Sequence, residues 1–181
     1  MANRQALREL QTRLAARLQQ ARTEGVAAGW LAVELAGKRF LLPLAQSGEI
    51  FPVTSVQKVP YTQQWFMGVA NLRGGLYGIV DLASFISGTR MLRAFDGSIR
   101  EQARLIALNS AMEINCAVLI DRLSGLRGVA DFVAREPSPE GSPPFMSAQY
   151  VDKSGLAWTE LDLQQLASSH EFLGIAALTT V

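Results

Sequence analysis

Residues 66–82 read FMGVANLRGGLYGIVDL, and this stretch decides the fold of the chain. It contains two apolar runs separated by Gly74-Gly75, which is the pattern of two strands joined by a tight turn. Asp81 stands where the second run ends, and a carboxylate there can accept free backbone N–H groups of a first helical turn. The stretch therefore predicts a strand, a glycine turn, a second strand and a short capped helix that ends at Gly88.

The same order of features recurs near the C-terminus. Asp162 and Gln165 have the spacing of a capping box, and each copy follows a predicted hairpin, at 30–44 and at 104–120. Two similar β units are expected, because many short strands with glycine-rich turns are typical of a barrel or a sandwich. The matching pairs are Phe66-Met67 with Phe145-Met146, the turn at Gly74-Gly75 with the turn at 153–156, and Val80-Asp81-Leu82 with Leu161-Asp162-Leu163.

Both ends of the chain extend beyond this repeat. Residues 3–24 carry Leu7, Leu10, Leu14 and Leu18 at helical spacing with no Gly or Pro, which predicts an amphipathic helix that stops at Gly25. Its leucine stripe could pack on its own domain, on a partner helix or second copy, or on a membrane surface. The apolar residues 172–178 are expected to form a last strand, and segments 90–101 and 136–144 to be exposed connections.

Composition places the chain among globular proteins. Of 181 residues, 49% are apolar and 18% charged, so disorder is excluded as the main state and one sizeable core is expected. A net charge of +1 argues against nucleic acid as a partner. The charge is uneven, since residues 1–104 sum to +6 and residues 105–181 to −5, which could steer a partner.

The chain is expected to be cytoplasmic. Its single cysteine, Cys116, lies in an apolar run, as a buried residue does in a reducing compartment. No apolar run reaches the 18 or so residues of a membrane helix, so no direct membrane insertion is expected.

The usual catalytic patterns are missing from the sequence. One His and one Cys cannot build a common zinc site, and no phosphate-binding glycine fingerprint occurs. We therefore expect no enzymatic activity, no metal and no cofactor. One alternative stays open, in which Ser169 or Ser168 acts with His170 as a small hydrolase. A second alternative is a homo-oligomeric module that acts through the N-terminal helix.

The segment 66–82 also resembles the signature of the CheW family, the chemotaxis coupling proteins, in which a Gly-Val-x-Asn-Leu-Arg-Gly turn precedes an apolar strand ending in Asp-Leu. The resemblance covers roughly residues 28–167 and includes both predicted hairpins. It implies a mainly β fold of two small five-stranded β-barrels around a shared apolar seam, with short capping helices. The expected organisation is an N-terminal helix at 1–25 and a CheW-like domain at 26–181, divided into β units at about 26–88 and 103–181.

The resemblance further implies a non-enzymatic adaptor that couples a methyl-accepting chemoreceptor to a CheA-type histidine kinase in a membrane-associated array. The receptor's signalling tip would sit in the apolar groove between the barrels, and the kinase regulatory domain would pair with one barrel. Arg73 matches the signature arginine, and it could support kinase coupling or tie backbone carbonyls of neighbouring strands. The residues expected at partner contacts are Arg73, Asn71, Gly68, Glu49, Ile50, Val53 and Val69.

Three features depart from the common family pattern. Ser47-Gly48 replaces an apolar-then-polar pair, Gly78 stands where proline is usual, and both termini extend beyond the common core. They suggest a specialised branch, of which the adaptors of type IV pilus, or twitching-motility, pathways are the most similar.

Overall fold

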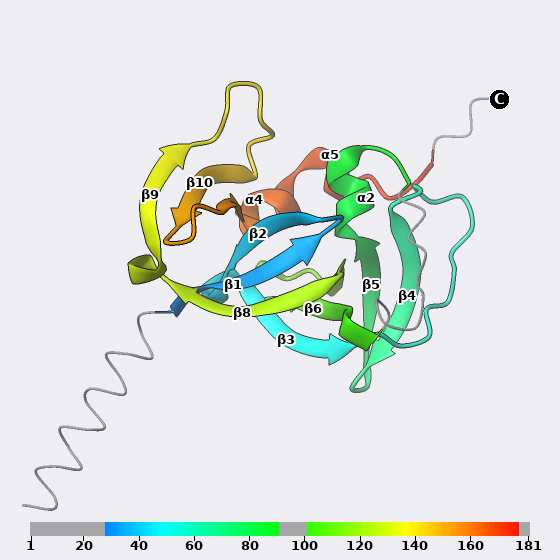
Figure 1. Ribbon diagram of the computed structural model, residues 1–181. Helices are drawn as coiled ribbons and strands as arrows, with labels where there is room; N and C mark the ends of the chain where they lie inside the picture. Colours follow the sequence, from blue (N-terminus) through cyan, green and yellow to red (C-terminus); the bar gives the residue numbers. More distant parts are fainter. Residues whose placement is uncertain (1–27, 91–100, 178–181) are drawn as a thin grey trace, which may run out of the picture.

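The computed structural model describes residues 28–90 and 101–177, and the helix predicted for residues 1–25 lies outside this part of the chain. The described residues are mainly β, as predicted (Figure 1). The short helices are α2 (Leu82–Ser87), α4 (Leu163–Ser168) and α5 (His170–Leu173), with single turns η1 (Leu44–Gln46), η2 (Ser110–Met112) and η3 (Val129–Asp131). The strands are β1 (Ala28–Leu35), β2 (Lys38–Pro43), β3 (Ser47–Pro52), β4 (Phe66–Leu72), β5 (Gly75–Asp81), β6 (Arg104–Leu108), β7 (Cys116–Ile120), β8 (Arg122–Gly128), β9 (Phe132–Pro137), β10 (Met146–Asp152) and β11 (Ala157–Leu161).

The strands form two curved sheets. One has six strands in the order β8-β1-β2-β11-β10-β9, and the other has five in the order β3-β6-β7-β5-β4. Each sheet takes strands from both halves of the chain, so the expected division into units at about 26–88 and 103–181 is wrong. The first hairpin, β1–β2, belongs with β8–β11, whereas the second, β6–β7, belongs with β3–β5.

Alternating side chains on the same strands build three cores. Trp30 and Ala32 point into the interior of the six-stranded sheet, whereas Leu31, Val33 and Leu35 point to the other face, as the period of two requires. Residues of β6 and β7 alternate in the same way between the interior of the five-stranded sheet and the opposite face. Strands buried on both faces explain why these segments read as continuous apolar runs in the sequence.

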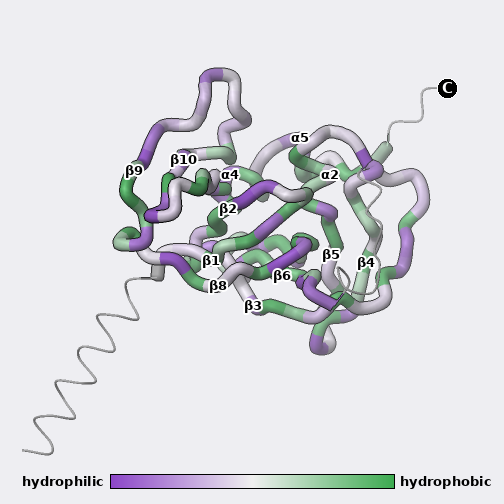
Figure 2. Tube along the Cα trace, viewed as in Figure 1, coloured by the Kyte–Doolittle hydropathy of each residue, from purple (hydrophilic) through white to green (hydrophobic). Residues whose placement is uncertain are grey.

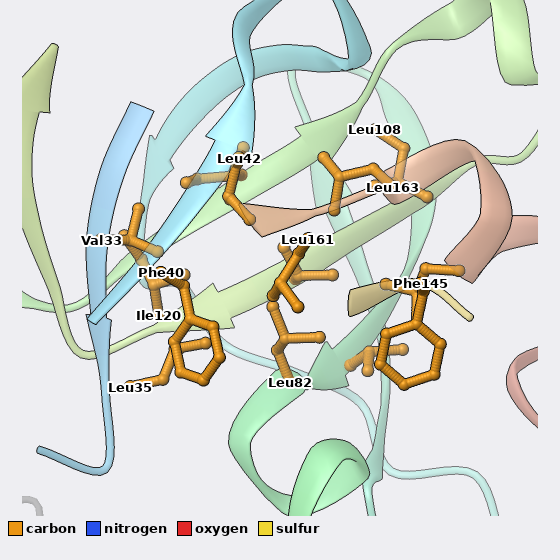
Figure 3. Packing of buried hydrophobic residues seen from close by; sticks show 14 of the residues in the cluster. Val33, Leu35, Phe40, Leu42, Leu82, Leu108, Ile120, Phe145, Leu161 and Leu163 are labelled. Atoms are coloured by element: carbon orange, nitrogen blue, oxygen red, sulfur yellow. The ribbon is translucent and has the colours of Figure 1, made fainter. Parts of the chain in front are cut away.

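The opposite faces of the two sheets meet in a shared apolar seam. Leu42 and Leu161 from the six-stranded sheet pack there with Leu108 and Ile120 from the five-stranded sheet, and Leu82 and Leu163 of the two capping helices close it (Figure 3). The predicted shared apolar seam is thereby confirmed, and it lies between the two interleaved sheets. Figure 2 shows the hydrophobic residues concentrated along these central strands and hydrophilic ones in outlying loops.

The two copies of the sequence repeat form the same structural elements, but the structure aligns them one residue differently from the match Phe66 with Phe145. In β4–β5 the pairing shifts between Phe66 and Gly68, and in β10–β11 it shifts between Met146 and Ala148. The structure thus matches Phe66 with Met146. In both copies an aspartate at the end of the second strand caps a short helix. Asp81 accepts the N–H of Ser84 at 3.3 Å, and Asp162 accepts the N–H groups of Gln164 and Gln165 at 3.0 Å.

The C-terminal tail is not the strand that the apolar run 172–178 predicted. Ser169 caps α5, and after Gly174 the described tail makes an isolated bridge between Ala176 and Thr62 instead of a strand. Phe172 is buried against Trp65, with stacked rings 6.0 Å apart. The run is apolar because a helical residue fills the seam, and not because a strand continues the sheet.

None of the helices within the described ranges is long and apolar enough to cross a membrane.

Candidate partner-binding site

The expected contact residues gather around the β4–β5 turn and strand β3. Arg73 and Gly74 form the two central positions of this turn and have φ values of 49° and 86°. Positive φ at both positions is the signature of a type I′ turn, whose twist suits a tight hairpin. The Oδ1 atom of Asn71 accepts the N–H of Gly74 at 2.8 Å and braces the turn. Arg73 is therefore held in a left-handed conformation that L-residues seldom adopt.

The guanidinium of Arg73 reaches across to β3. It pairs with the Glu49 carboxylate at 2.5 Å and lies 6.0 Å from the centroid of the Phe51 ring. The partners of Arg73 are thus the side chains of Glu49 and Phe51, where backbone carbonyls were one of the two expectations. Glu49 and Phe51 are two residues apart on one strand, so one face of β3 presents both to the arginine.

This contact links the two outer strands of the five-stranded sheet. β3 and β4 lie at opposite ends of the strand order, so no strand-to-strand ladder joins them. The Arg73–Glu49 pair and the backbone bridge between Gln57 and Val69 both connect the β3 side of the sheet to the β4 side. The sequence-distant residues Glu49 and Arg73 are thus brought together by curling of the sheet.

The pair is exposed, which limits its effect on stability and leaves it open to partners. The side chain of Arg73 is 76% exposed and that of Glu49 42% exposed. Exposed ion pairs contribute at most about 1 kcal/mol, because water competes for both charges. A guanidinium has five N–H donors, and one carboxylate engages at most two of them in a bidentate pair. Arg73 can therefore bind an acceptor from another molecule while its own turn keeps it in place.

Gly68 lies where two backbone segments touch. Gln57 and Val69 exchange two backbone hydrogen bonds, of 2.7 and 2.9 Å, directly beside it. A Cβ on Gly68 would lie 2.1 Å from the carbonyl oxygen of Gln57, and its φ of 129° suits glycine. The close backbone approach expected at Gly68 is thus present. Its role in partner binding stays a prediction.

The three apolar candidates have different surroundings. Ile50 packs partly buried against the seam, and Val53 packs partly buried against the interior of the five-stranded sheet. Val69 is half-buried, and its backbone makes the bridge to Gln57. Ile50 packs in a different cluster from Phe51, the ring beside Arg73, whereas Val53 packs in the same cluster as Phe51.

Two residues of the site were not singled out from the sequence. Phe51 is 8% exposed and lies under the guanidinium, and Leu76, directly after the turn, is 63% exposed. The position of Phe51 beside Arg73 could have been inferred from the sequence, because Phe51 is two residues from Glu49 and so shares its face of the strand. The exposure of Leu76 could not, because a strand pattern alone does not distinguish an exposed leucine from a buried one.

The hydrolase alternative finds no support in the geometry. The hydroxyl of Ser169 donates to the carbonyl oxygen of Leu166 at 2.9 Å and accepts the N–H of Phe172 at 3.3 Å, so it serves as a helix cap. His170 is the first residue of α5 and is exposed. Burial raises the pKa of the Cys116 thiol to about 12, which leaves it unreactive. Among the described residues no group of His, Cys, Asp and Glu is arranged to hold a metal ion.

Comparison with known proteins agrees with this architecture. The model of the CheW-like domain matches residues 29–171. Protein PilI of Pseudomonas aeruginosa is 26% identical over 145 residues, which cover 78% of this chain and 76% of PilI. The crystal structure of the scaffolding protein TtCheW from Thermoanaerobacter tengcongensis superposes with a TM-score of 0.62 at 17% identity, covering 80% of this chain and 95% of that one. With two curved sheets around one seam and a family match across most of its length, the chain belongs to the CheW-like domain family.

Proposed function

We propose that this chain is a non-enzymatic adaptor that couples a methyl-accepting chemoreceptor to a CheA-type histidine kinase, in a pathway that controls type IV pilus twitching motility. The family supports the adaptor role, because CheW-like proteins are scaffolds between receptors and kinases. The relation to PilI over 78% of the chain supports the pilus branch. An adaptor of this kind works in the cytoplasm and is recruited to membrane-associated receptor arrays.

The kinase regulatory domain is proposed to bind at the β4–β5 turn and β3. The observation that carries this assignment is the Arg73–Glu49 pair, which presents a braced and largely exposed guanidinium beside the Phe51 ring. Arginine next to an aromatic ring is a frequent composition of binding hot spots. Asn71 and Gly68 keep the turn and its strand in shape, and exposed Leu76 supplies an apolar neighbour.

The receptor tip is proposed to bind at the margin of the seam near η1 and η2. Met112 and Ile114 are partly buried against the seam there, and Leu44 is exposed. The Nδ2 atom of Asn109 donates to the carbonyl oxygen of Ala45 at 2.9 Å, so the two turns lie together. An amphipathic helical hairpin could lay an apolar face along such a margin.

Calorimetric titration of the full chain with the regulatory domain of a CheA-type kinase from the same cell tests the kinase assignment. Arg73→Ala should weaken binding at least about tenfold, or 1.4 kcal/mol, with an unchanged far-UV circular dichroism spectrum. Arg122→Ala is the matched control, because Arg122 forms a partly exposed ion pair with Glu34 at 2.9 Å in the other sheet. It should bind like the unmodified chain.

Raising the salt concentration in the same titration separates charge from shape. If the guanidinium accounts for much of the affinity, binding should weaken with salt in the unmodified chain and much less in the Arg73→Ala variant. Equal affinities of the Arg73 and Arg122 variants would contradict the assignment of the site. Absence of saturable binding to any such kinase domain would contradict the adaptor function itself.

A further inference from the structure

The corner between β8 and β9 exposes apolar side chains that the adaptor function does not use. Leu126, Val129 and Val133 lie within eight residues around η3 and are 58%, 71% and 66% exposed. Most large apolar residues of the described chain are buried, so three such side chains at one corner are unusual. Figure 2 shows the hydrophobic colour at this corner.

The corner is also firmly built. The Oδ2 atom of Asp131 accepts the N–H of Gly128 at 2.7 Å and closes the single turn of η3. Phe132, on the other side of the turn, packs edge-on against Trp30 with ring centroids 5.8 Å apart. A braced backbone with exposed aliphatic side chains is suited to receiving another apolar surface.

The position of the corner points to its occupant. Ala28, the first described residue of β1, pairs with Gly128, the residue before Val129. The described chain therefore begins directly beside the exposed corner (Figure 1). The sequence that precedes Ala28 carries the leucine stripe of Leu7, Leu10, Leu14 and Leu18, which has no aromatic anchor and needs apolar packing to be stable as a helix.

We propose that the leucine stripe of residues 7–18 docks in cis on the corner formed by Leu126, Val129 and Val133. Only residues 25–27 separate the expected helix from β1, and Leu18 is ten positions before Ala28 in the sequence, which is close enough along the chain to reach Val129. A tether this short raises the effective concentration of the stripe at the corner to the millimolar range. Docking removes both the exposed side chains of the corner and the bare stripe from water. It is independent of the adaptor role, since it concerns only how this chain covers its own surface.

Cross-linking of the full chain with a short bis-maleimide tests the proposal. The double variant Leu18→Cys with Val129→Cys should form an intramolecular link, seen as a faster-migrating monomer on a denaturing gel. The matched control pairs Gln19→Cys with Val129→Cys, because Gln19 has the same tether but lies off the stripe. Native Cys116 does not interfere, because it is buried and its pKa is raised to about 12.

The cross-linking rates of the two cysteine pairs distinguish docking through the leucine stripe from a free tether. Docking through the stripe predicts that the Leu18 pair links at least about tenfold faster than the Gln19 pair, in proportion to their effective concentrations. Adding Leu10→Glu and Leu14→Glu should slow the Leu18 pair to the rate of its control, with the circular dichroism of the β domain retained. Equal rates for the two pairs would mean a tether without docking. Links formed only between two chains would mean that a second copy covers the corner, and either result would overturn docking in cis.

Discussion

Among glycine-to-alanine substitutions in the signature segment 66–82, Gly68→Ala is expected to lower the free energy of unfolding the most. The new Cβ would lie 2.1 Å from the carbonyl oxygen of Gln57, and real side chains do not approach a backbone oxygen so closely. The two segments must separate, which breaks the pair of hydrogen bonds between Gln57 and Val69. Two such bonds contribute about 1–3 kcal/mol to the free energy of unfolding.

Backbone strain adds to this loss. The φ of Gly68 is 129°, and an alanine forced into such a region costs about 1–3 kcal/mol. Together the two effects predict a loss of about 4 kcal/mol, which for a chain of this size lowers Tm by about 8–16 °C. Two other glycines separate the causes. Gly74 has a φ of 86° and open space around its Cβ position, and Gly29 has open space without a positive φ.

Urea unfolding of the three alanine variants, followed by tryptophan fluorescence, measures these terms. Gly74→Ala should lose only the strain energy of about 1–3 kcal/mol, and Gly29→Ala should be unchanged or slightly more stable. The expected order of stability is therefore Gly29→Ala, Gly74→Ala, Gly68→Ala. If Gly68→Ala loses no more than Gly74→Ala, the close contact with Gln57 does not matter for stability and the reasoning is refuted.

Three further outcomes are expected. The hydrogen bond from the indole N–H of Trp158 is the main cause that lowers the pKa of Asp152. The ionised carboxylate therefore stabilises the fold fully above the unfolded pKa of about 3.9, and this stabilisation is lost as the pH falls below that value. Asp152→Asn should make the stability depend less steeply on pH in the acid range, and an unchanged dependence would contradict this. Because Cys116 is buried with a raised pKa, a thiol reagent should label it only at the rate of global unfolding, whereas rapid labelling of the folded chain would mean that the seam opens locally. Arg73→Ala and Arg122→Ala should each change the free energy of unfolding by less than about 1 kcal/mol, and a larger loss in the former would show that its pair with Glu49 holds the sheet closed.

Local features of this fold could be predicted from the sequence because they depend on neighbouring residues. The turn at Gly74, the N-caps Asp81 and Asp162 and the alternating strands all follow from spacings of a few residues. The resemblance to the family supplied the seam, and the clusters of buried side chains agree with it.

Strand partners and long-range contacts could not be predicted in this way. A strand pattern states which residues are buried but not which strand lies beside it, so the β1–β2 hairpin was placed in the wrong unit. The contact between Glu49 and Arg73 joins residues 24 positions apart in the chain, and it arises only when the sheet curls. The apolar character of the tail predicts burial but does not distinguish a strand from a helix. Ser169 is a good helix cap and Gly174 a good helix stop, and they favour the short helix that forms.

The interleaving of the two sheets also constrains how the chain can fold during its synthesis. The parallel pairing of Phe40 with Thr159 cannot form until most of the chain has left the ribosome. Likewise β1 cannot pair on its second edge until β8 has been synthesised. Neither half has a complete sheet of its own to close early. Pairings between residues so far apart in the chain slow folding and leave apolar strands unpaired in the meantime. We therefore expect the nascent N-terminal half to depend on chaperones, and a chain split between β5 and β6 to fold only when both fragments are present together.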